Sequence, residues 1–385
     1  MSQALLRRMA LKAYATGYEH VARPLTFRHT AQASHERMLA LLRWLDVQEW
    51  AVATLEVMNR AFFPQASTHV GGVTLPHPLI LSAGLVKGDG FTDEEAAVCA
   101  AHRRNIIPGW RSVPALVGPV EFGSFTRWPR AGNLGEVLWR DEGTQSTQNR
   151  IGLKNPGIRA AAQFLGVWRA QLPSVFGINI APSPGADDET ARKEILEALA
   201  LLFDAGVQPA WLTLNLSCPN TEDDAGARQT EAAARLLAGQ VVDFLSPRKT
   251  PLWIKIAPDL SDEQYRALLR VFADTGVSAV IATNTLPRPV PNHASVTAGA
   301  GGGWLRPYSL RIVKLLAEER TRHGYPVDIV ASGGVLSSRH LHQFREAGAQ
   351  AFQYWSALVY RGPLAAALLH AEASYEEGHH DNTGA

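Results

Sequence analysis

The stretch from Pro251 to Thr285, PLWIKIAPDLSDEQYRALLRVFADTGVSAVIATNT, holds two short apolar runs separated by one longer amphipathic run. The short runs, PLWIKIA (251–257) and AVIATNT (279–285), are rich in apolar residues, which predicts two strands. Between them, DEQYRALLRVFADTG has apolar residues at helical spacing, follows a serine and ends at a glycine, as a capped helix does. A strand, a helix and a second strand in this order predict parallel strands joined by a crossover helix.

The same alternation extends over most of the chain. Six further short runs predict strands: PLILSAG (78–84), VEFGSFT (120–126), VFGINIA (175–181), WLTLNLS (211–217), DIVASGG (328–334) and AFQYWSA (351–357). Longer segments with helical spacing separate most of them, among them ETARKEILEALALLFDAG, EAAARLLAGQVVDFL, YSLRIVKLLAEER and RHLHQFREAG. Eight strands are the number that closes a (β/α)8 TIM barrel, an α/β fold. A doubly wound open sheet is the competing fold, but SAGLVKGDG after the first strand matches its glycine-rich turn poorly.

Composition excludes several classes of protein. Of the 385 residues, 46% are hydrophobic and 19% are charged, which is ordinary for a globular protein with a large core. The net charge of +1 provides no basic field, so we expect no nucleic-acid partner. Cys99 and Cys218 are too few for a disulfide scaffold or a zinc cluster, which suits a reducing compartment such as the cytoplasm. No apolar block with a cleavage site begins the chain, so we expect no secretory signal.

The chain is expected to divide into three parts: a helical extension (1–69), the barrel (70–375) and a polar tail (376–385). The extension has apolar residues at helical spacing, which indicates packing against the barrel. The alternative is an interfacial helix pair that touches a membrane and admits a lipophilic molecule. Residues 127–148 show no clear period and predict a long loop on the barrel, where loops often carry function.

Polar residues gather where the predicted strands end, and barrel enzymes place their active sites at the C-terminal ends of the strands. These residues are Lys87, Asn149, Asn179, Asn215, Cys218, Asn220, Thr221, Lys255, Thr283, Asn284, Thr285, Ser332, Gly333, Gly334 and Ser356. Asparagines offer both donors and acceptors and suit a planar ring with carbonyl and N–H groups. The glycine pair of ASGGV indicates a backbone nest for a phosphate. Cys99, in the helical run EEAAVCAAHRR, is expected to be a small buried core residue.

Several motifs in order resemble the dihydroorotate dehydrogenase family, whose members are FMN enzymes of pyrimidine biosynthesis. The resemblance extends from about Val70 to Pro363. It is carried by SAGLVKGDGF, VEFGS, NRIGLKNPG, FGINIA, LNLSCPNT, KIAPDLSDEQ, TNTLPRP, ASGGV and QYWSALVYRGP. It implies oxidation of (S)-dihydroorotate to orotate, with hydride transfer from C6 to N5 of FMN. Two alternatives are an FMN oxidoreductase of the same barrel that acts on another dihydropyrimidine-like substrate, and a non-catalytic ligand-binding paralogue.

The resemblance also implies residue roles. Cys218 would be the base for the C5 proton, and Lys255 would stabilise charge beside the flavin. The ordinary pKa of a thiol, about 8.5, allows a thiolate near neutrality when a cation lies close. Dihydroorotate would be held by Asn149, Ile151, Gly152, Leu153, Asn215, Asn220, Asn284 and Thr285. FMN would be held by Ala83, Gly84, Lys87, Gly123, Ser124, Asn179, Asn215, Lys255, Thr283, Gly333, Gly334, Trp355 and Ser356.

The class features within the family are mixed. A cysteine base marks its soluble class, whereas the helical extension, KIAPDL and TNT resemble its membrane-associated quinone class. Arg140 falls where the quinone class keeps an arginine at its quinone site. We therefore expect quinone as electron acceptor and peripheral contact of the N-terminal helices with the inner face of the cell membrane. Val86, Trp304 and Leu305 depart from the family pattern, and the last two alter the edge of the expected FMN pocket.

Overall fold

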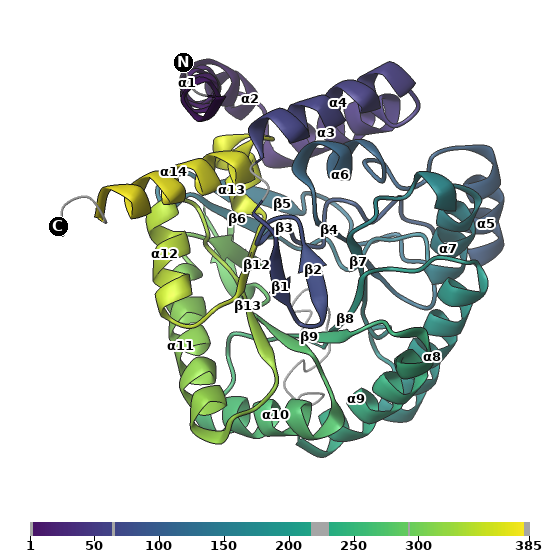
Figure 1. Ribbon diagram of the computed structural model, residues 1–385. Helices are drawn as coiled ribbons and strands as arrows, with labels where there is room; N and C mark the ends of the chain where they lie inside the picture. The colour runs from purple at the N-terminus through teal and green to yellow at the C-terminus, as the bar shows by residue number, and fades with distance from the viewer. Residues whose placement is uncertain (1–2, 64–65, 217–230, 292, 381–385) are drawn as a thin grey trace.

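Eight parallel strands close into a barrel in the computed structural model, which describes residues 3–63, 66–216, 231–291 and 293–380 (Figure 1). In spatial order the strands are β3 (Leu79–Leu81), β4 (Val120–Phe125), β7 (Phe176–Ile180), β8 (Trp211–Asn215), β9 (Leu252–Ile256), β10 (Ala279–Ala282), β13 (Asp328–Ser332) and β14 (Ala351–Tyr354). Strand β14 pairs with β3 and closes the ring. All eight strand predictions and the TIM barrel are confirmed.

The helices α5 (Glu94–Arg103), α7 (Ile158–Val167), α8 (Asp188–Asp204), α9 (Glu231–Leu245), α10 (Asp262–Thr275), α11 (Arg306–His323), α12 (Ser338–Glu346) and α14 (Ala365–His380) surround the barrel (Figure 1). Short 3₁₀ turns occur at Arg169–Gln171 and Ser246–Arg248. The caps explain several boundaries. Helix α10 begins with a capping box between Ser261 and Gln264 and ends at Gly276, whose φ of +82° favours glycine.

Large aromatic side chains fill the bottom of the barrel. The rings of Trp211 and Trp253 stack with centroids 4.7 Å apart, and both side chains are fully buried. The hairpin of β1 (Thr68–Val70) and β2 (Val73–Leu75) covers this end, and the Trp253 indole N–H donates to the Gly71 carbonyl at 2.9 Å (Figure 1). Because side chains alternate along a strand, Trp253 and Lys255 both point into the barrel, one layer apart.

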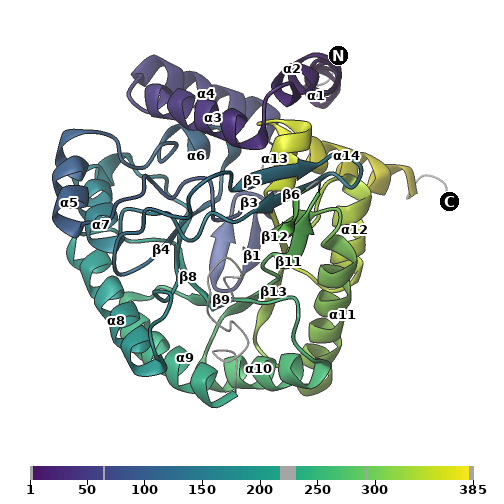
Figure 2. The same ribbon diagram turned by 180° about the vertical axis from the view of Figure 1, so that it is seen from behind.

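A second, four-stranded antiparallel sheet lies over the C-terminal ends of the barrel strands (Figure 2). Its order is β11 (Leu286–Val290), β12 (His293–Gly302), β6 (Ser146–Asn149) and β5 (Leu138–Asp141). The segment predicted as a loop at 127–148 therefore contains one strand and most of a second. The prediction missed them because short polar strands such as STQN have no apolar alternation.

The N-terminal segment is helical, as expected, and lies outside the ring of barrel helices (Figures 1 and 2). It consists of α1 (Gln3–Gly17), the π-helical turn η1 (Tyr18–Ala22), α2 (Arg23–Phe27), α3 (Ala31–Leu45) and α4 (Glu49–Phe62). The buried Asp46 carboxylate attaches it to the barrel. It accepts from the backbone N–H groups of Gly109 and Ser112 at 2.7 and 2.8 Å, at the start of α6 (Ser112–Val117). Within the described part of the chain, no helix is both long and apolar enough to span a membrane.

Two further details differ from the expectations. Cys99 is exposed on α5, so its prediction as a buried core residue was wrong; Ala97 and Ala101 occupy the buried positions of that helix instead. Helix α14 extends to His380 and so includes part of the segment predicted as a polar tail.

Candidate active site

A cavity opens at the C-terminal ends of the barrel strands and encloses about 1160 Å³, open solvent at its mouth included. Most residues that the sequence assigned to substrate or cofactor line it. They are Ala83, Gly84, Lys87, Ser124, Asn149, Ile151, Leu153, Asn179, Asn215, Lys255, Thr283, Asn284, Thr285, Gly333, Gly334, Trp355 and Ser356. The closed barrel brings them together from eight different strand ends, although their roles remain predictions.

The other assigned residues lie elsewhere. Gly123 and Gly152 neighbour lining residues without lining the cavity themselves, and Arg140 lies on β5. Cys218 and Asn220 fall outside the described residues. The cavity is also lined by residues that were not predicted from the strand ends: Ser82, Leu138, Thr147, Gln148, Gly301, Gly302, Val335, Leu336 and Gln353. Several come from the second sheet, whose pairing over the cavity has no local signal in the sequence.

A series of hydrogen bonds joins the asparagines on one side of the cavity. The Asn215 amide donates to Ser124 Oγ at 3.1 Å, and its Oδ1 accepts from Asn284 Nδ2 at 3.2 Å. Asn284 Oδ1 in turn accepts from the backbone N–H of Thr285 at 2.8 Å. Each bond fixes which end of an amide faces which neighbour, so the series presents donors and acceptors in a set order.

Lys255 places a buried amino group beside Asn215. Its side chain belongs to β9, directly opposite Asn215 of β8, and is only 7% exposed. Its Nζ donates to Gln353 Oε1 at 3.1 Å. Burial lowers the pKa of Lys255, and the negative charge of Glu121 opposes this shift.

The cavity fits a planar, multiply hydrogen-bonding cofactor that carries a phosphate. Asn179 is fully buried, and its Oδ1 has no hydrogen-bond partner among the described residues, so a bound donor would satisfy it. Among the other lining residues, Gly333 and Gly334 have φ of +116° and +92°, and a Cβ on Gly334 would lie 2.5 Å from Cβ of Arg306. Only glycine fits at these two positions, whose backbone lines the cavity. The set of residues therefore fits FMN.

Trp304 and Leu305 have separate positions at this edge. Leu305 is buried and lines the cavity beside Gly333. Trp304 points away from it, with the Arg288 guanidinium 3.7 Å above its ring and Tyr308 at a ring distance of 5.1 Å. Leu305 therefore adds apolar surface to the cavity, whereas Trp304 packs between the second sheet and α11.

The N-terminal helices reach the edge of the site. The Arg140 guanidinium lies 4.0 Å from the Phe27 ring centroid and donates to the His29 carbonyl. On α3, the His35 ring lies 6.5 Å from the ring of Trp355, a lining residue. Burial, with a smaller effect of the Lys87 charge, lowers the pKa of His35 to about 4, so this imidazole is neutral at pH 7. His35 was not predicted from the sequence, since a single histidine in an amphipathic helix has no distinctive spacing.

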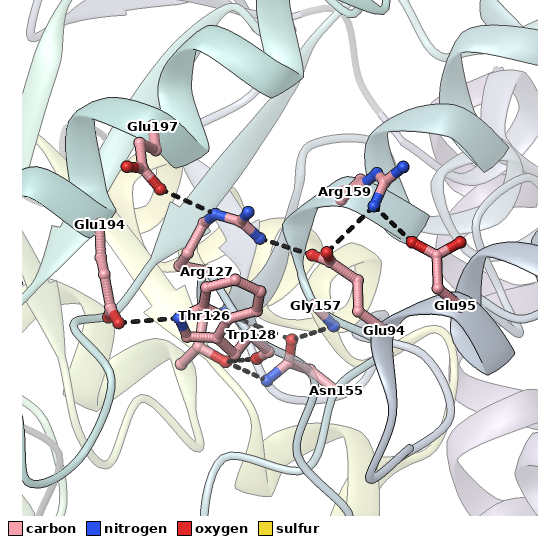
Figure 3. A network of polar contacts seen from close by, with 10 residues as sticks. All are labelled: Glu94, Glu95, Thr126, Arg127, Trp128, Asn155, Gly157, Arg159, Glu194 and Glu197. Carbon is pink, nitrogen blue, oxygen red and sulfur yellow. Dashed lines mark hydrogen bonds and ion pairs between the residues drawn. The ribbon is translucent and has the colours of Figure 1, made fainter.

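Figure 3 shows the polar network that anchors the loop after β4. Arg127 pairs with Glu94 at 2.5 Å and Glu197 at 3.1 Å, and so connects this loop to α5 and α8. Beside it, the fully buried Asn155 donates to Thr126 Oγ1 at 2.9 Å and to the Leu153 carbonyl at 2.7 Å. Asn155 thereby fixes the segment 149–153, which contributes several lining residues, to the end of β4.

Comparison with known proteins agrees with this geometry. The family model described as dihydroorotate dehydrogenase matches residues 65–374. The chain is 32% identical over 365 residues to a dihydroorotate dehydrogenase (quinone) of Chromobacterium violaceum, covering 92% of this chain and 97% of that protein. It is also 32% identical over 358 residues to the Bordetella pertussis protein of the same name, covering 89% and 93%.

Among solved structures, the dihydroorotate dehydrogenase of Eimeria tenella in complex with ferulenol superimposes with a TM-score of 0.68. The two chains are 23% identical over 87% of this chain and 92% of the other. At this identity the superposition supports the barrel fold with its helical extension.

Proposed function

The chain belongs to the dihydroorotate dehydrogenase family, and from this premise we propose that it oxidises dihydroorotate to orotate and passes the electrons to a quinone. The observation that carries the proposal is the hydrogen-bonded series of Asn215, Asn284 and Thr285 beside the buried Lys255 in a cavity that fits FMN. When bound, FMN would accept hydride from the substrate and deliver its electrons to the quinone. The chain's own residues bind, orient and deprotonate the substrate.

The asparagine side chains on one side of the cavity are assigned to substrate recognition. We assign the ring and carboxylate of dihydroorotate to Asn149, Asn215, Asn284 and Thr285, with Ile151, Gly152 and Leu153 as the surrounding loop and Asn220 as a further donor outside the described residues. Amides suit this task because each can donate to one carbonyl and accept from one N–H of the substrate. A substrate analogue that lacks one of these groups is strongly rejected, because it leaves a buried amide without a hydrogen-bond partner.

Two residues act on the reacting atoms in this proposal. Cys218 removes the proton from C5 of the substrate; it lies outside the described residues and is assigned from its place in LNLSCPNT. Lys255 places a positive charge at the cofactor face of the cavity, where negative charge develops during the reaction. The further residues that we assign to contact with FMN are Ala83, Gly84, Lys87, Gly123, Ser124, Asn179, Asn215, Thr283, Gly333, Gly334, Trp355 and Ser356.

We assign the quinone to the junction between the cavity and the N-terminal helices. Arg140 and Phe27 meet there, and α3 approaches the cavity through His35. The α3–α4 hairpin also exposes Leu41, Trp44, Val47 and Trp50, each at least 48% accessible. An exposed apolar surface with tryptophans suits peripheral contact with the inner face of the membrane, from which a lipophilic acceptor would enter. In this arrangement residues 1–69 form the acceptor-side extension and 70–375 the catalytic barrel, and the predicted tail 376–385 begins within α14.

The visible absorption spectrum tests the proposal. The purified protein should show flavin bands that bleach on anaerobic addition of dihydroorotate and return on addition of a short-chain quinone. Asn284→Ala should retain the flavin but need roughly 10- to 100-fold more dihydroorotate, since it loses about 1.4 to 3 kcal/mol of hydrogen bonding. The matched control is Asn59→Ala, which removes an amide on α4 that donates to the Leu116 carbonyl. Flavin bands that persist with dihydroorotate but bleach with another dihydropyrimidine would overturn the assigned substrate.

The proton acceptor has its own test. Cys218→Ser should slow reduction by dihydroorotate at pH 7, because a serine hydroxyl is a far weaker acid than a thiol and is less readily available as the base. Cys99→Ser, at the exposed cysteine on α5, is the matched control. An unchanged rate in the Cys218 variant would remove this residue from the mechanism.

A further inference from the structure

A carboxylate lies buried inside the barrel, directly below the cavity. Glu121 of β4 is fully inaccessible to solvent and does not line the cavity itself. An isolated charge in such a place would cost several kcal/mol, so its partners decide whether it is tolerated.

Four donors surround this carboxylate, each from a different side chain. Oε1 accepts from Asn179 Nδ2 at 2.7 Å. Oε2 accepts from Thr213 Oγ1 at 2.8 Å, Gln353 Nε2 at 3.1 Å and Trp211 Nε1 at 3.3 Å. An indole N–H can only donate, and an ionised carboxylate can only accept. The arrangement therefore matches the ionised form of Glu121, which needs no acceptor of its own.

The carboxylate also determines which way two amides face. Because Asn179 turns its Nδ2 toward Glu121, its Oδ1 remains without a partner among the described residues, at the cavity wall. Because Gln353 turns its Nε2 toward Glu121, its Oε1 is available to accept from Lys255 Nζ at 3.1 Å. If either amide were reversed, its carbonyl oxygen would face a carboxylate oxygen of Glu121, and a reversed Gln353 would also turn its N–H donors toward the Lys255 ammonium.

We propose that Glu121 is a positioning residue for the reaction: its charge orients Asn179 and Gln353 and keeps Lys255 protonated at the cofactor face of the cavity. The inference rests on the proposed function for the identity of the cofactor. Among the described residues that line the cavity, Lys87 and Lys255 are the titratable ones. Glu121 lies behind this lining, and its negative charge favours the protonated form of Lys255. Gln353 connects Glu121 and Lys255, since its amide donates to the Glu121 carboxylate and accepts from the Lys255 amino group.

The reduction potential of the bound flavin measures this role independently of turnover. A positive charge near an electron acceptor raises its potential, and Lys255 is closer to the cavity than Glu121. In Glu121→Gln holoprotein, the potential should exceed that of the parent at acidic pH, where Lys255 is still charged and its counter-charge is gone. At alkaline pH it should fall below the parent, because Lys255 loses its proton without Glu121. The difference should therefore change sign as the pH rises through the range in which Lys255 of the variant loses its proton.

Three variants make the test specific. Glu121→Asp keeps the charge and should restore the parent's dependence on pH. Thr213→Val removes one donor without changing any charge and should not produce a change of sign. Glu319→Gln removes a carboxylate that is also buried, 7% exposed, but belongs to α11 and pairs with Arg266 and Arg322; it should leave the potential as in the parent.

The results separate this inference from the proposed function. A difference in potential that is constant over pH, or absent, would show that Glu121 does not control Lys255. Failure of dihydroorotate to bleach the flavin would instead overturn the substrate, since potentials are measured with chemical reductants. If Glu121→Gln does not fold, ¹⁵N NMR of lysine Nζ in the parent measures the protonation state of Lys255 directly, with the signal assigned by its absence in Lys255→Arg. A neutral amine at Lys255 at pH 7 would then overturn the proposal.

Discussion

His77 should make the stability of this protein sensitive to mild acid. It lies between β2 and β3 with 2% of its surface exposed, and its ring stacks on Phe63 at a centroid distance of 4.9 Å. Its Nε2 lies 3.2 Å from the Val117 carbonyl. Burial lowers the pKa of His77 from 6.5 to about 4 in the folded protein. The unfolded chain regains the ordinary pKa, so it binds a proton at a pH where the folded protein does not.

The magnitude follows from proton linkage. Between about pH 6.5 and pH 4 the unfolded state binds more protons, so the free energy of unfolding falls as the pH falls. At pH 5 the contribution of His77 amounts to about 2 kcal/mol. His77→Leu should remove this part of the dependence of stability on pH. The lost ring stacking also lowers the free energy of unfolding, but by the same amount at every pH.

Urea unfolding at pH 7.5 and pH 5 measures the effect. The parent should lose about 2 kcal/mol more than His77→Leu between the two pH values. His69→Leu, which removes an exposed histidine from β1, is the matched control. Equal losses in the parent and in His77→Leu would refute the reasoning, because they would show that His77 is not held neutral by the fold.

Three further predictions concern the attachment of the extension and the site. Asp46→Asn should cost about 2 to 4 kcal/mol of stability and speed proteolysis between α3 and α4, because the carboxylate loses its charge toward the N–H groups of Gly109 and Ser112; intact resistance would argue against this anchor. Asn155→Ala should raise KM for dihydroorotate roughly tenfold at unchanged flavin content, since about 1.4 kcal/mol of loop ordering is lost; an unchanged KM would exclude this role. Arg140→Ala should raise KM for quinone while leaving anaerobic reduction by dihydroorotate at the parental rate, and slower reduction would place Arg140 on the substrate side.

Much of the barrel was predictable because its signals are local. A run such as DIVASGG needs no distant partner to indicate a buried strand, and Ser261 and Gly276 mark the ends of α10 within one segment. The predicted cavity residues followed from the same logic, since every parallel strand of a closed barrel ends at the same face. The second sheet was not predictable in this way. Strands β6 and β12 pair although about 150 residues separate them, a distance at which periodicity carries no information.

The sequence by itself determined the fold class, the face that bears the site and most of the residue types gathered there, because side-chain alternation and capping act over a few residues. Only the tertiary structure decided which side chains meet. Glu121 and Gln353 lie 232 residues apart and share a hydrogen bond because the barrel closes between β14 and β3. In the sequence, Glu121 is one acidic residue in a predicted strand; in the folded protein, the four donors that surround it make a buried charge tolerable.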